Sequence, residues 1–214
     1  MLAAERHSML IAAIGQHPYL RAKRLFDILL SLLLLPVVIP VLIALAVAVR
    51  LDSPGPIMFK QQRTGHHGKR FGMYKFRTMV QNAEELKAGL AHLNILPPPD
   101  FKIIDDPRIT RVGRFLRKTS LDELPQILNV LRGEMSLVGP RPTSFAPDTY
   151  LLWHTARLEV RPGITGLWQL KGRNASTFDE RLRLDVEYIN RMSMGYDLKI
   201  IALTILAVVR GSGA

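Results

Sequence analysis

The 214-residue sequence predicts an α+β fold, mostly helical, in which one membrane-inserted segment precedes a small globular domain. Three observations support this fold class. Residues 28–49 carry no charge, residues 52–56 form a cluster of chain-breaking residues, and two short aromatic-rich runs flank a turn sequence at 64–68. This length has room for one ordinary domain and a short appendage. We therefore expect an N-terminal extension at 1–22, a membrane helix at 23–52 and a single domain at 53–214.

The apolar segment at 28–49 is long enough to enter a membrane, but two prolines interrupt it. As a helix it would extend about 33 Å, and the hydrocarbon core is about 30 Å thick. Pro36 and Pro40 each remove an N–H donor and crowd the carbonyl four residues earlier, so we expect a strong bend near the middle. Basic residues flank both sides and, by the positive-inside rule, would keep both ends in the cytosol; these residues are Arg21, Lys23, Arg24, Arg50, Lys60 and Arg63.

The residues alone leave two alternatives open for this segment, a kinked spanning helix and a re-entrant hairpin. A signal peptide is disfavoured, because about 24 residues precede the apolar stretch and the stretch exceeds the usual length of about 7–15 residues. A second apolar run at 198–209 would reach only about 18 Å and cannot span a membrane. That run is expected to be either a buried core helix or an interfacial helix lying on the bilayer.

The domain at 53–214 is expected to begin with a β-hairpin. Runs at 57–63 and 70–77 are rich in Phe, Tyr, Met and Ile, and they flank the sequence Thr64-Gly65-His66-His67-Gly68. This pattern is typical of two short strands joined by a tight turn. A helix is predicted at 81–94, ended by three prolines at 97–99.

Composition excludes several classes of protein. The 29 Lys and Arg against 18 Asp and Glu give a net charge of +11, which suits nucleic acid, anionic lipid headgroups or phosphorylated substrates. The absence of cysteine excludes a disulfide framework, thiol catalysis and cysteine-based zinc sites. The signatures of P-loop nucleotide binding, dinucleotide-binding folds, zinc proteases and serine hydrolases are also absent.

Asp122 has two interpretations. Ser120 and Glu123 match a capping box, in which Asp122 would be an ordinary acidic residue of a first helical turn. Alternatively, Asp122 is a carboxylate at a helix start near Arg117 and other cations, where phosphate groups also bind, and it can attack phosphorus. On a helix, the adjacent Asp122 and Glu123 diverge by about 100°, so different roles are easier for them than a shared one.

Three loops downstream combine arginine with turn residues. They are Gly139-Pro140-Arg141-Pro142, Arg161-Pro162-Gly163-Ile164-Thr165-Gly166 and Gly172-Arg173-Asn174. Stiff loops limit the entropy lost when a guanidinium binds phosphate, and a diphosphate needs several fixed donors. Asp185 is either an acid on a helix surface or a partner that orients one of these arginines.

These motifs, with Lys75-Phe76-Arg77-Thr78-Met79, Asp106-Pro107-Arg108 and Ser120-Leu121-Asp122-Glu123-Leu124, stand in the same order as in the bacterial sugar transferase family. That family comprises the monotopic polyprenyl-phosphate phosphoglycosyl transferases. The resemblance extends from about Lys23 to about Arg210. It implies a re-entrant membrane helix hairpin broken at Pro36 and Pro40, followed by a small cytosolic catalytic domain with a short β-hairpin and interfacial amphipathic helices. The implied location is the bacterial inner membrane, with the catalytic domain facing the cytosol.

The resemblance also implies an activity, the transfer of a sugar-1-phosphate from a UDP-sugar to undecaprenyl phosphate with release of UMP. Asp122 would form a covalent phosphosugar ester and bind Mg²⁺, and Glu123 would handle proton transfer or metal positioning. The implied phosphate-binding and orienting set is Arg77, Arg117, Arg141, Arg161, Arg173 and Asp185. Hexose donors such as UDP-glucose or UDP-galactose fit better than diacetamido sugars. Membrane lipids are further expected partners, nucleic acid is not, and homodimer formation is left open.

Two rival functions remain at this stage. One is a non-catalytic, membrane-anchored basic binding module, which the net charge suits, although its basic residues are interleaved with acids instead of forming a tract. The other is a lipid-linked pyrophosphatase, which would release free sugar phosphate without a lipid acceptor.

Overall fold

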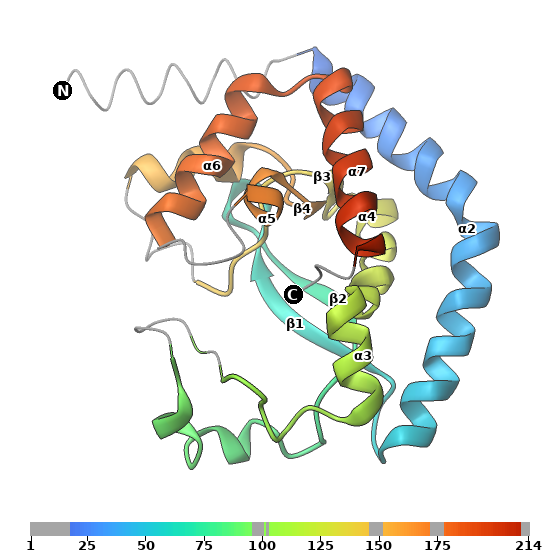
Figure 1. Ribbon diagram of the computed structural model, residues 1–214. Coiled ribbons are helices and arrows are strands. Elements are labelled where there is room, and N and C mark those ends of the chain that lie inside the picture. Colours follow the sequence, from blue (N-terminus) through green and yellow to red (C-terminus); the bar gives the residue numbers. More distant parts are fainter. Residues whose placement is uncertain (1–17, 96–100, 102, 146–151, 172–177, 211–214) are drawn as a thin grey trace.

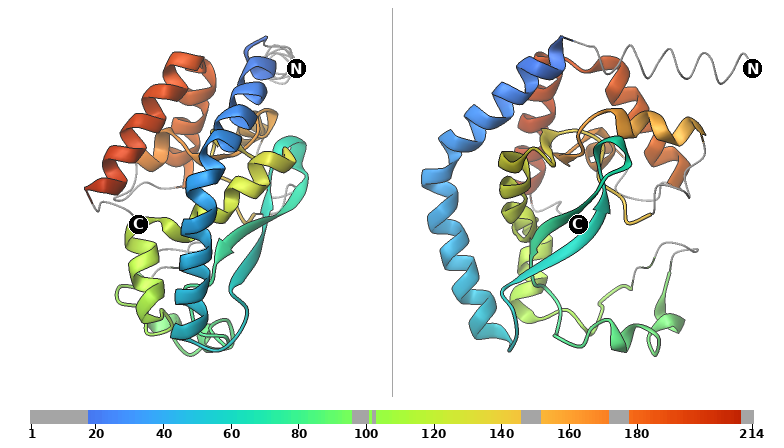
Figure 2. Two further views of the ribbon diagram at one scale, coloured as in Figure 1. Left: turned by 90° about the vertical axis from the view of Figure 1, so that its right-hand side faces the viewer. Right: turned by 180° about the vertical axis from the view of Figure 1, so that it is seen from behind.

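The computed structural model describes residues 18–95, 101, 103–145, 152–171 and 178–210. The long helix α2 (Tyr19–Asp52) bows along one side of the molecule (Figure 1). The β-hairpin of β1 (Met58–Thr64) and β2 (Arg70–Phe76) lies on the far side of α3 (Arg111–Thr119) and α4 (Ile127–Arg132) from α2, as the right-hand view of Figure 2 also shows. The other α-helices among the described residues are α5 (Leu167–Lys171), α6 (Phe178–Arg191) and α7 (Met194–Val209).

Two small sheets organise the domain. Strands β1 and β2 are antiparallel, with Met58 opposite Phe76, which confirms the predicted hairpin. Strands β3 (Ser136–Val138) and β4 (Gly163–Thr165) are parallel. Gly163 permits that pairing, because a Cβ atom there would lie 2.1 Å from the backbone nitrogen of Gly139. The 3-10 segment η4 (Leu121–Gln126) joins α3 to α4 and contacts β2.

The predicted helix at 81–94 is wrong. This stretch forms only two single-turn 3-10 segments, η2 (Glu85–Lys87) and η3 (Ala91–Leu93). None of residues 81–95 is buried. Short helices gain most of their stability from packing an apolar face, and this stretch packs none.

Helix α2 is continuous through Pro36 and Pro40, so the predicted hairpin is not confirmed. Its middle is exposed: Leu33 is 74% and Val37 is 68% accessible to solvent. The helix is long and apolar enough to cross a membrane by length and composition. An uncovered apolar surface of this extent is compatible with membrane association.

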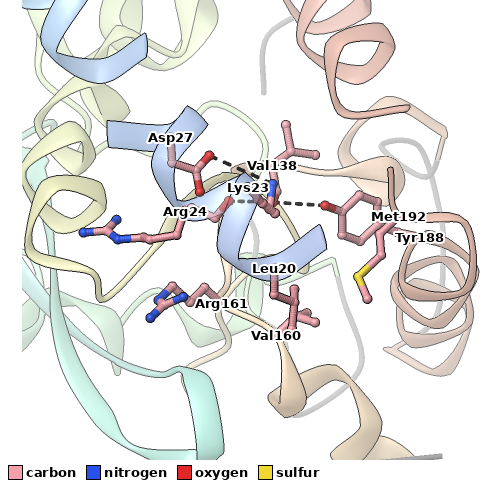
Figure 3. A pocket seen from close by; sticks show the side chains of 10 residues that line it. Leu20, Lys23, Arg24, Asp27, Val138, Val160, Arg161, Tyr188 and Met192 are labelled. Carbon is pink, nitrogen blue, oxygen red and sulfur yellow. Dashed lines mark hydrogen bonds and ion pairs between the residues drawn. The ribbon is translucent and has the colours of Figure 1, made fainter. Parts of the chain in front are cut away.

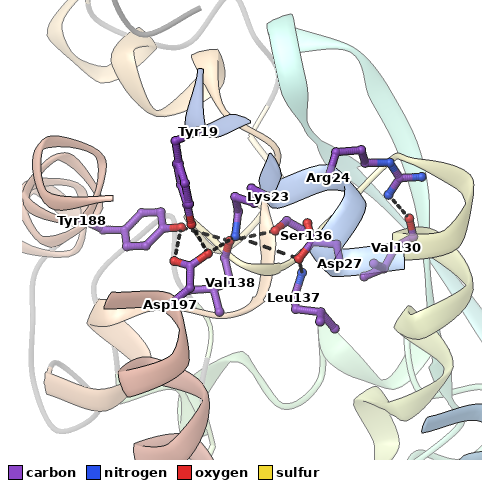
Figure 4. A network of polar contacts seen from close by, with 10 residues as sticks. All are labelled: Tyr19, Lys23, Arg24, Asp27, Val130, Ser136, Leu137, Val138, Tyr188 and Asp197. Carbon is purple, nitrogen blue, oxygen red and sulfur yellow. Dashed lines mark hydrogen bonds and ion pairs between the residues drawn. The ribbon is translucent and has the colours of Figure 1, made fainter. Parts of the chain in front are cut away.

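The N-terminal end of α2 is fixed to the domain by a buried polar network (Figure 4). Tyr19 and Lys23 both donate to one carboxylate oxygen of Asp197, and the Tyr188 hydroxyl donates to the other at 2.8 Å. Asp27 accepts from the backbone nitrogen of Leu137 at 3.2 Å. The first turns of α2 are therefore joined to α6, α7 and β3.

The C-terminal end of α2 is fixed to the same domain. Arg77 donates to the carbonyls of Val49 and Ser53 at 3.3 and 2.6 Å, and the Asp52 carboxylate accepts from the Val112 backbone nitrogen at 3.1 Å. Val49 packs with Phe76 and Leu116 in the core. Both ends of α2 are therefore held by the same domain.

Helix α7 is in part the buried core helix expected at 198–209. Its Ile200 is buried in the core that α6 and β3 share. Leu198, Leu203, Ile205 and Leu206 are between 43% and 57% exposed. One face of α7 is therefore a core element, and another presents an apolar surface.

Candidate active site

Asp122 and Glu123 lie on η4, and the capping box expected around them is not formed. Ser120 adopts a left-handed conformation, with φ of 57°, and is both the last cap of α3 and the residue before η4. Its hydroxyl caps no helix, and the Glu123 carboxylate turns toward Lys75 and Arg141. The capping box is therefore wrong, although Asp122 does lie in a first turn, that of η4.

Glu123 is clamped between two cations. Its Oε1 atom is 2.7 Å from Lys75 Nζ, and the Arg141 guanidinium donates to Oε2 at 3.0 Å and to Oε1 at 2.5 Å. Burial alone would raise the pKa of Glu123, but Arg141 and Lys75 hold that pKa well below its usual value. Glu123 therefore stays ionised near neutral pH, which disfavours its expected role in proton transfer.

Asp122 is the carboxylate left available in this site. It is 8% exposed, and no hydrogen bond or ion pair joins it to another residue in the described part of the chain. Burial raises the pKa of Asp122 and the charge of Glu123 adds to this, while Lys75, Arg117 and Arg141 oppose it. A buried carboxylate near three cations, with its oxygens unengaged, is suited to a ligand or a reaction.

Arg117 and Arg141 approach Asp122 from different elements. Arg117, on α3, donates from Nε to the Thr78 hydroxyl at 2.9 Å. Arg141 follows β3, in the stiff loop between two prolines. The structure thus brings together three sequence-predicted residues, Asp122, Glu123 and Arg141, with Arg117 beside them.

Asp185 is connected to this site through Arg157, a residue that the sequence did not point to. Asp185 is 1% exposed and pairs with Arg157 at 2.8 Å. Arg157 in turn donates to the backbone carbonyl of Arg141. Burial raises the pKa of Asp185 to about 6, against the opposing charges of Arg157 and Arg181. Asp185 is therefore not a surface acid but one end of a buried chain of contacts behind the Arg141 loop.

The other predicted residues lie elsewhere. Arg77 holds the C-terminal end of α2, as described above, and Arg161 donates from Nε to the Gly133 carbonyl at 2.9 Å, at the end of α4. In the structure, the side chains of Arg77 and Arg161 bond to backbone or hydroxyl groups, and these bonds hold the ends of helices. Arg173 and its loop lie outside the described residues. Pro36 and Pro40 are within α2.

Lys75 and Arg157 are the functional candidates that the site prediction did not contain. Lys75 is part of one of the motifs that carry the family resemblance, so the sequence could have identified it as a site residue. Arg157 lies in the 3-10 segment η6 (Leu152–Glu159), outside every motif identified in the sequence. Its position behind Arg141 depends on tertiary structure alone.

The residues at Asp122 fit the expected Mg²⁺. The described residues contain no group of three or more His, Cys, Asp or Glu that would enclose a metal ion. Mg²⁺ bound with a phosphorylated substrate, however, usually takes only one or two carboxylates and completes its shell with phosphate and water. The unengaged oxygens of Asp122 meet that requirement.

A cavity of about 20 Å³ elsewhere in the molecule is not part of this site (Figure 3). It lies beside the first turns of α2 and is lined by residues of the anchoring region, among them Lys23, Arg24, Arg161 and Tyr188. Asp122 does not line it. Its polar groups are already used to fix the ends of α2 and α4.

Comparison with known proteins gives one family. A family profile described as "Bacterial sugar transferase" matches residues 18–211. The chain is 47% identical over 197 residues to the undecaprenyl-phosphate galactose phosphotransferase of Salmonella typhimurium. It is 42% identical over 196 residues to the UDP-glucose:undecaprenyl-phosphate glucose-1-phosphate transferase of Escherichia coli. It is also 40% identical over 200 residues to the exopolysaccharide production protein ExoY of Sinorhizobium fredii.

The lengths of these relatives differ. The matched region covers 90% of this chain but 41% of the Salmonella protein, and 86% of this chain but 39% of the Escherichia protein. For ExoY it covers 90% of this chain and 88% of the relative. The chain therefore spans less than half of two of these relatives and most of the third.

Proposed function

Because the chain belongs to the bacterial sugar transferase family, we propose that it transfers a sugar-1-phosphate from a UDP-sugar to undecaprenyl phosphate. The observation that carries the proposal is Asp122, a buried carboxylate with unengaged oxygens, close to Lys75, Arg117 and Arg141. The names of the Salmonella and Escherichia relatives specify galactose and glucose transfer, which supports a hexose donor. The name of the ExoY relative supports a place in exopolysaccharide production.

In the proposed reaction, Asp122 attacks the phosphorus that bears the sugar. A bond forms between an Asp122 oxygen and that phosphorus, and the bond from phosphorus to the bridging oxygen breaks, so that UMP leaves. An oxygen of undecaprenyl phosphate then attacks the same phosphorus and releases Asp122, giving undecaprenyl-diphosphate-sugar. Lys75, Arg117 and Arg141 neutralise the negative charge that gathers on the oxygens, the largest contribution expected in phosphoryl transfer.

Asp122 would also help to hold Mg²⁺, together with oxygens of the donor. The ion would supply further positive charge against the diphosphate. Glu123 stays paired with Lys75 and Arg141 in the free protein, which supports a positioning role for it instead of proton transfer.

We further propose that α2 inserts into the cytoplasmic membrane from the cytosolic side and returns, as a bowed re-entrant helix. The support is that both ends of α2 are bonded to the domain carrying Asp122, while its middle is apolar and exposed. The exposed apolar face of α7 would lie at the same interface. This arrangement would hold the site at the depth where a lipid phosphate resides.

This topology predicts that positions 21 and 60 are both cytosolic. The chain has no cysteine, so single cysteines at Arg21 and at Lys60 provide a clean background for labelling. We expect an impermeant thiol reagent to label neither position in intact spheroplasts and both after lysis. Labelling of position 21 from outside intact cells would mean that α2 spans the membrane.

Arg141→Lys is expected to lower kcat/KM by about 100-fold. An ammonium group cannot reproduce the planar two-pronged contact that Arg141 makes with Glu123 and would make with phosphate. Steady-state kinetics of UMP release measure the effect. Arg191→Lys is the matched control, because Arg191 is exposed and pairs only with Glu187 among the described residues. Equal kinetics for the two variants would remove Arg141 from the site.

The proposed function is tested by incubating the purified protein with Mg²⁺, undecaprenyl phosphate and single UDP-sugars, and measuring UMP. We expect UMP release with a hexose donor and formation of a lipid-linked sugar diphosphate. Release of free sugar phosphate without lipid would support a pyrophosphatase instead. No turnover of any UDP-sugar, with retention of nucleic acid at about 0.2 M salt, would support a basic binding module.

A further inference from the structure

The pairing of Glu123 raises a question about how the site receives its donor. Arg141 directs both of its terminal nitrogens to the Glu123 carboxylate, and Lys75 directs its ammonium to the same carboxylate. Arg117, the other cation near Asp122, donates from Nε to Thr78. In the structure, the two best-placed phosphate donors are therefore already engaged.

A carboxylate between a guanidinium and an ammonium has the geometry of a phosphoryl group bound to the same cations. Both anions offer two oxygens to the planar fork of arginine, and lysine binds either as a point charge. Glu123 is adjacent to Asp122 in the chain, so a phosphoryl group in its place would lie beside the proposed nucleophile.

We propose that Glu123 occupies, in the protein without donor, the position of one phosphoryl group between Lys75 and Arg141, and that the donor diphosphate displaces it from Arg141. This inference rests on the proposed function. It makes Lys75 a further donor-binding residue, and it makes the Glu123–Arg141 contact a competitor of the substrate.

The local charges favour such an exchange. Lys75, Arg117 and Arg141 are three basic side chains beside two carboxyl groups, Asp122 and Glu123, so basic groups outnumber acidic ones before any ligand binds. Without an anion between them, Lys75 and Arg141 would be mostly buried cations lacking a partner, with side chains only 16% and 28% exposed. Glu123 therefore keeps the cations ordered until a diphosphate replaces it.

The exchange predicts that neutralising Glu123 strengthens donor binding while harming catalysis. UDP is a suitable probe, because it carries the diphosphate of every UDP-sugar and has no sugar to transfer. In Glu123→Gln the amide competes poorly for Arg141, so we expect UDP to bind about tenfold more tightly in the presence of Mg²⁺, roughly the effect of one charge-assisted hydrogen bond. Isothermal titration calorimetry on the full chain in nanodiscs measures this.

The chain offers a closely matched control. Glu187 also lies between a lysine and an arginine, at 3.2 Å from both Lys171 and Arg191, on α6 and outside the site. Glu187→Gln removes the same charge from the same kind of cluster, and we expect it to leave UDP affinity unchanged. Adding Lys75→Met to Glu123→Gln should abolish the gain, since Lys75 would then be absent from the phosphate site.

Unchanged UDP affinity in Glu123→Gln would overturn the proposed exchange. Weaker UDP affinity would also overturn it, because that result would show that Glu123 helps to hold the donor's metal. If Glu123→Gln unfolds, Glu123→Asp tests the same point, because its shorter side chain keeps the charge but loses part of the contact with Arg141; a smaller gain in affinity is expected. The proposed function is assessed separately, by covalent labelling of the parent protein with UDP-hexose. A labelled parent with no gain in Glu123→Gln rejects only the exchange, whereas a parent that neither labels nor binds UDP rejects the function.

Discussion

Asp122→Asn is expected to lower turnover by about 10⁴-fold or more while leaving the fold intact. The amide keeps the shape of the side chain but loses the anion that attacks phosphorus, and loss of a covalent nucleophile removes most of the catalysis. The fold should tolerate the change, because Asp122 makes no hydrogen bond or ion pair within the described part of the chain. UMP release and the thermal unfolding midpoint measure the two effects.

The covalent intermediate is the direct test of this role. We expect parent protein incubated with Mg²⁺ and UDP-hexose, without lipid, to gain one hexose-phosphate by intact mass, and peptide mapping should assign it to Asp122. Initial-rate lines should be parallel, as in a ping-pong mechanism. Asp105→Asn is the control, because Asp105 is exposed and its positive φ of 54° suits asparagine.

A different mechanism would give a different set of results. If no adduct forms, the initial-rate lines intersect and Asp122→Asn stays active, the lipid phosphate attacks the donor directly. Asp122 would then serve only as an acid near the arginines. The other residues of the site would keep their electrostatic role in that case.

The hairpin and the long helix could be predicted from sequence because local patterns determine them. The aromatic-rich runs and the turn at 64–68 are close together in the chain, and they pair as β1 and β2. The apolar length of α2 is equally local. Its two prolines lie within the helix and do not end it, although each removes one N–H donor.

The site was harder to predict, because the same short pattern fits two structures. Ser120 and Glu123 have capping-box spacing, but the left-handed Ser120 ends α3, and Glu123 is drawn away by Arg141 and Lys75. The direction of the Glu123 side chain is decided by Arg141 and Lys75, which lie 18 and 48 positions from Glu123 in the chain. The contact of Arg157 with the Arg141 carbonyl also depends on tertiary structure, so no sequence motif predicts it.

Lys23→Met is expected to destabilise the protein by about 3 kcal/mol or more, the largest effect on stability that we predict. Lys23 donates to Asp197 and lies 4.0 Å from Asp27, and these two carboxylates are 0% and 1% exposed. Removing one partner of a buried ion pair leaves an uncompensated buried charge, which costs about 3–5 kcal/mol. In a domain of this size the unfolding midpoint should fall by about 10 °C.

Arg21→Met is the control that separates the loss of the buried Lys23–Asp197 pair from the mere loss of one positive charge at this end of α2. Arg21 is exposed half a turn before Lys23, so its loss removes the same positive charge from the same end of α2. We expect it to change the midpoint little. The double variant Lys23→Met, Asp197→Asn should recover part of the lost stability, because it also removes one of the stranded carboxylates. If Lys23→Met and Arg21→Met unfold at the same temperature, the network does not anchor α2. The bonds at Arg77 and Asp52 would then have to hold the helix against the domain from its other end.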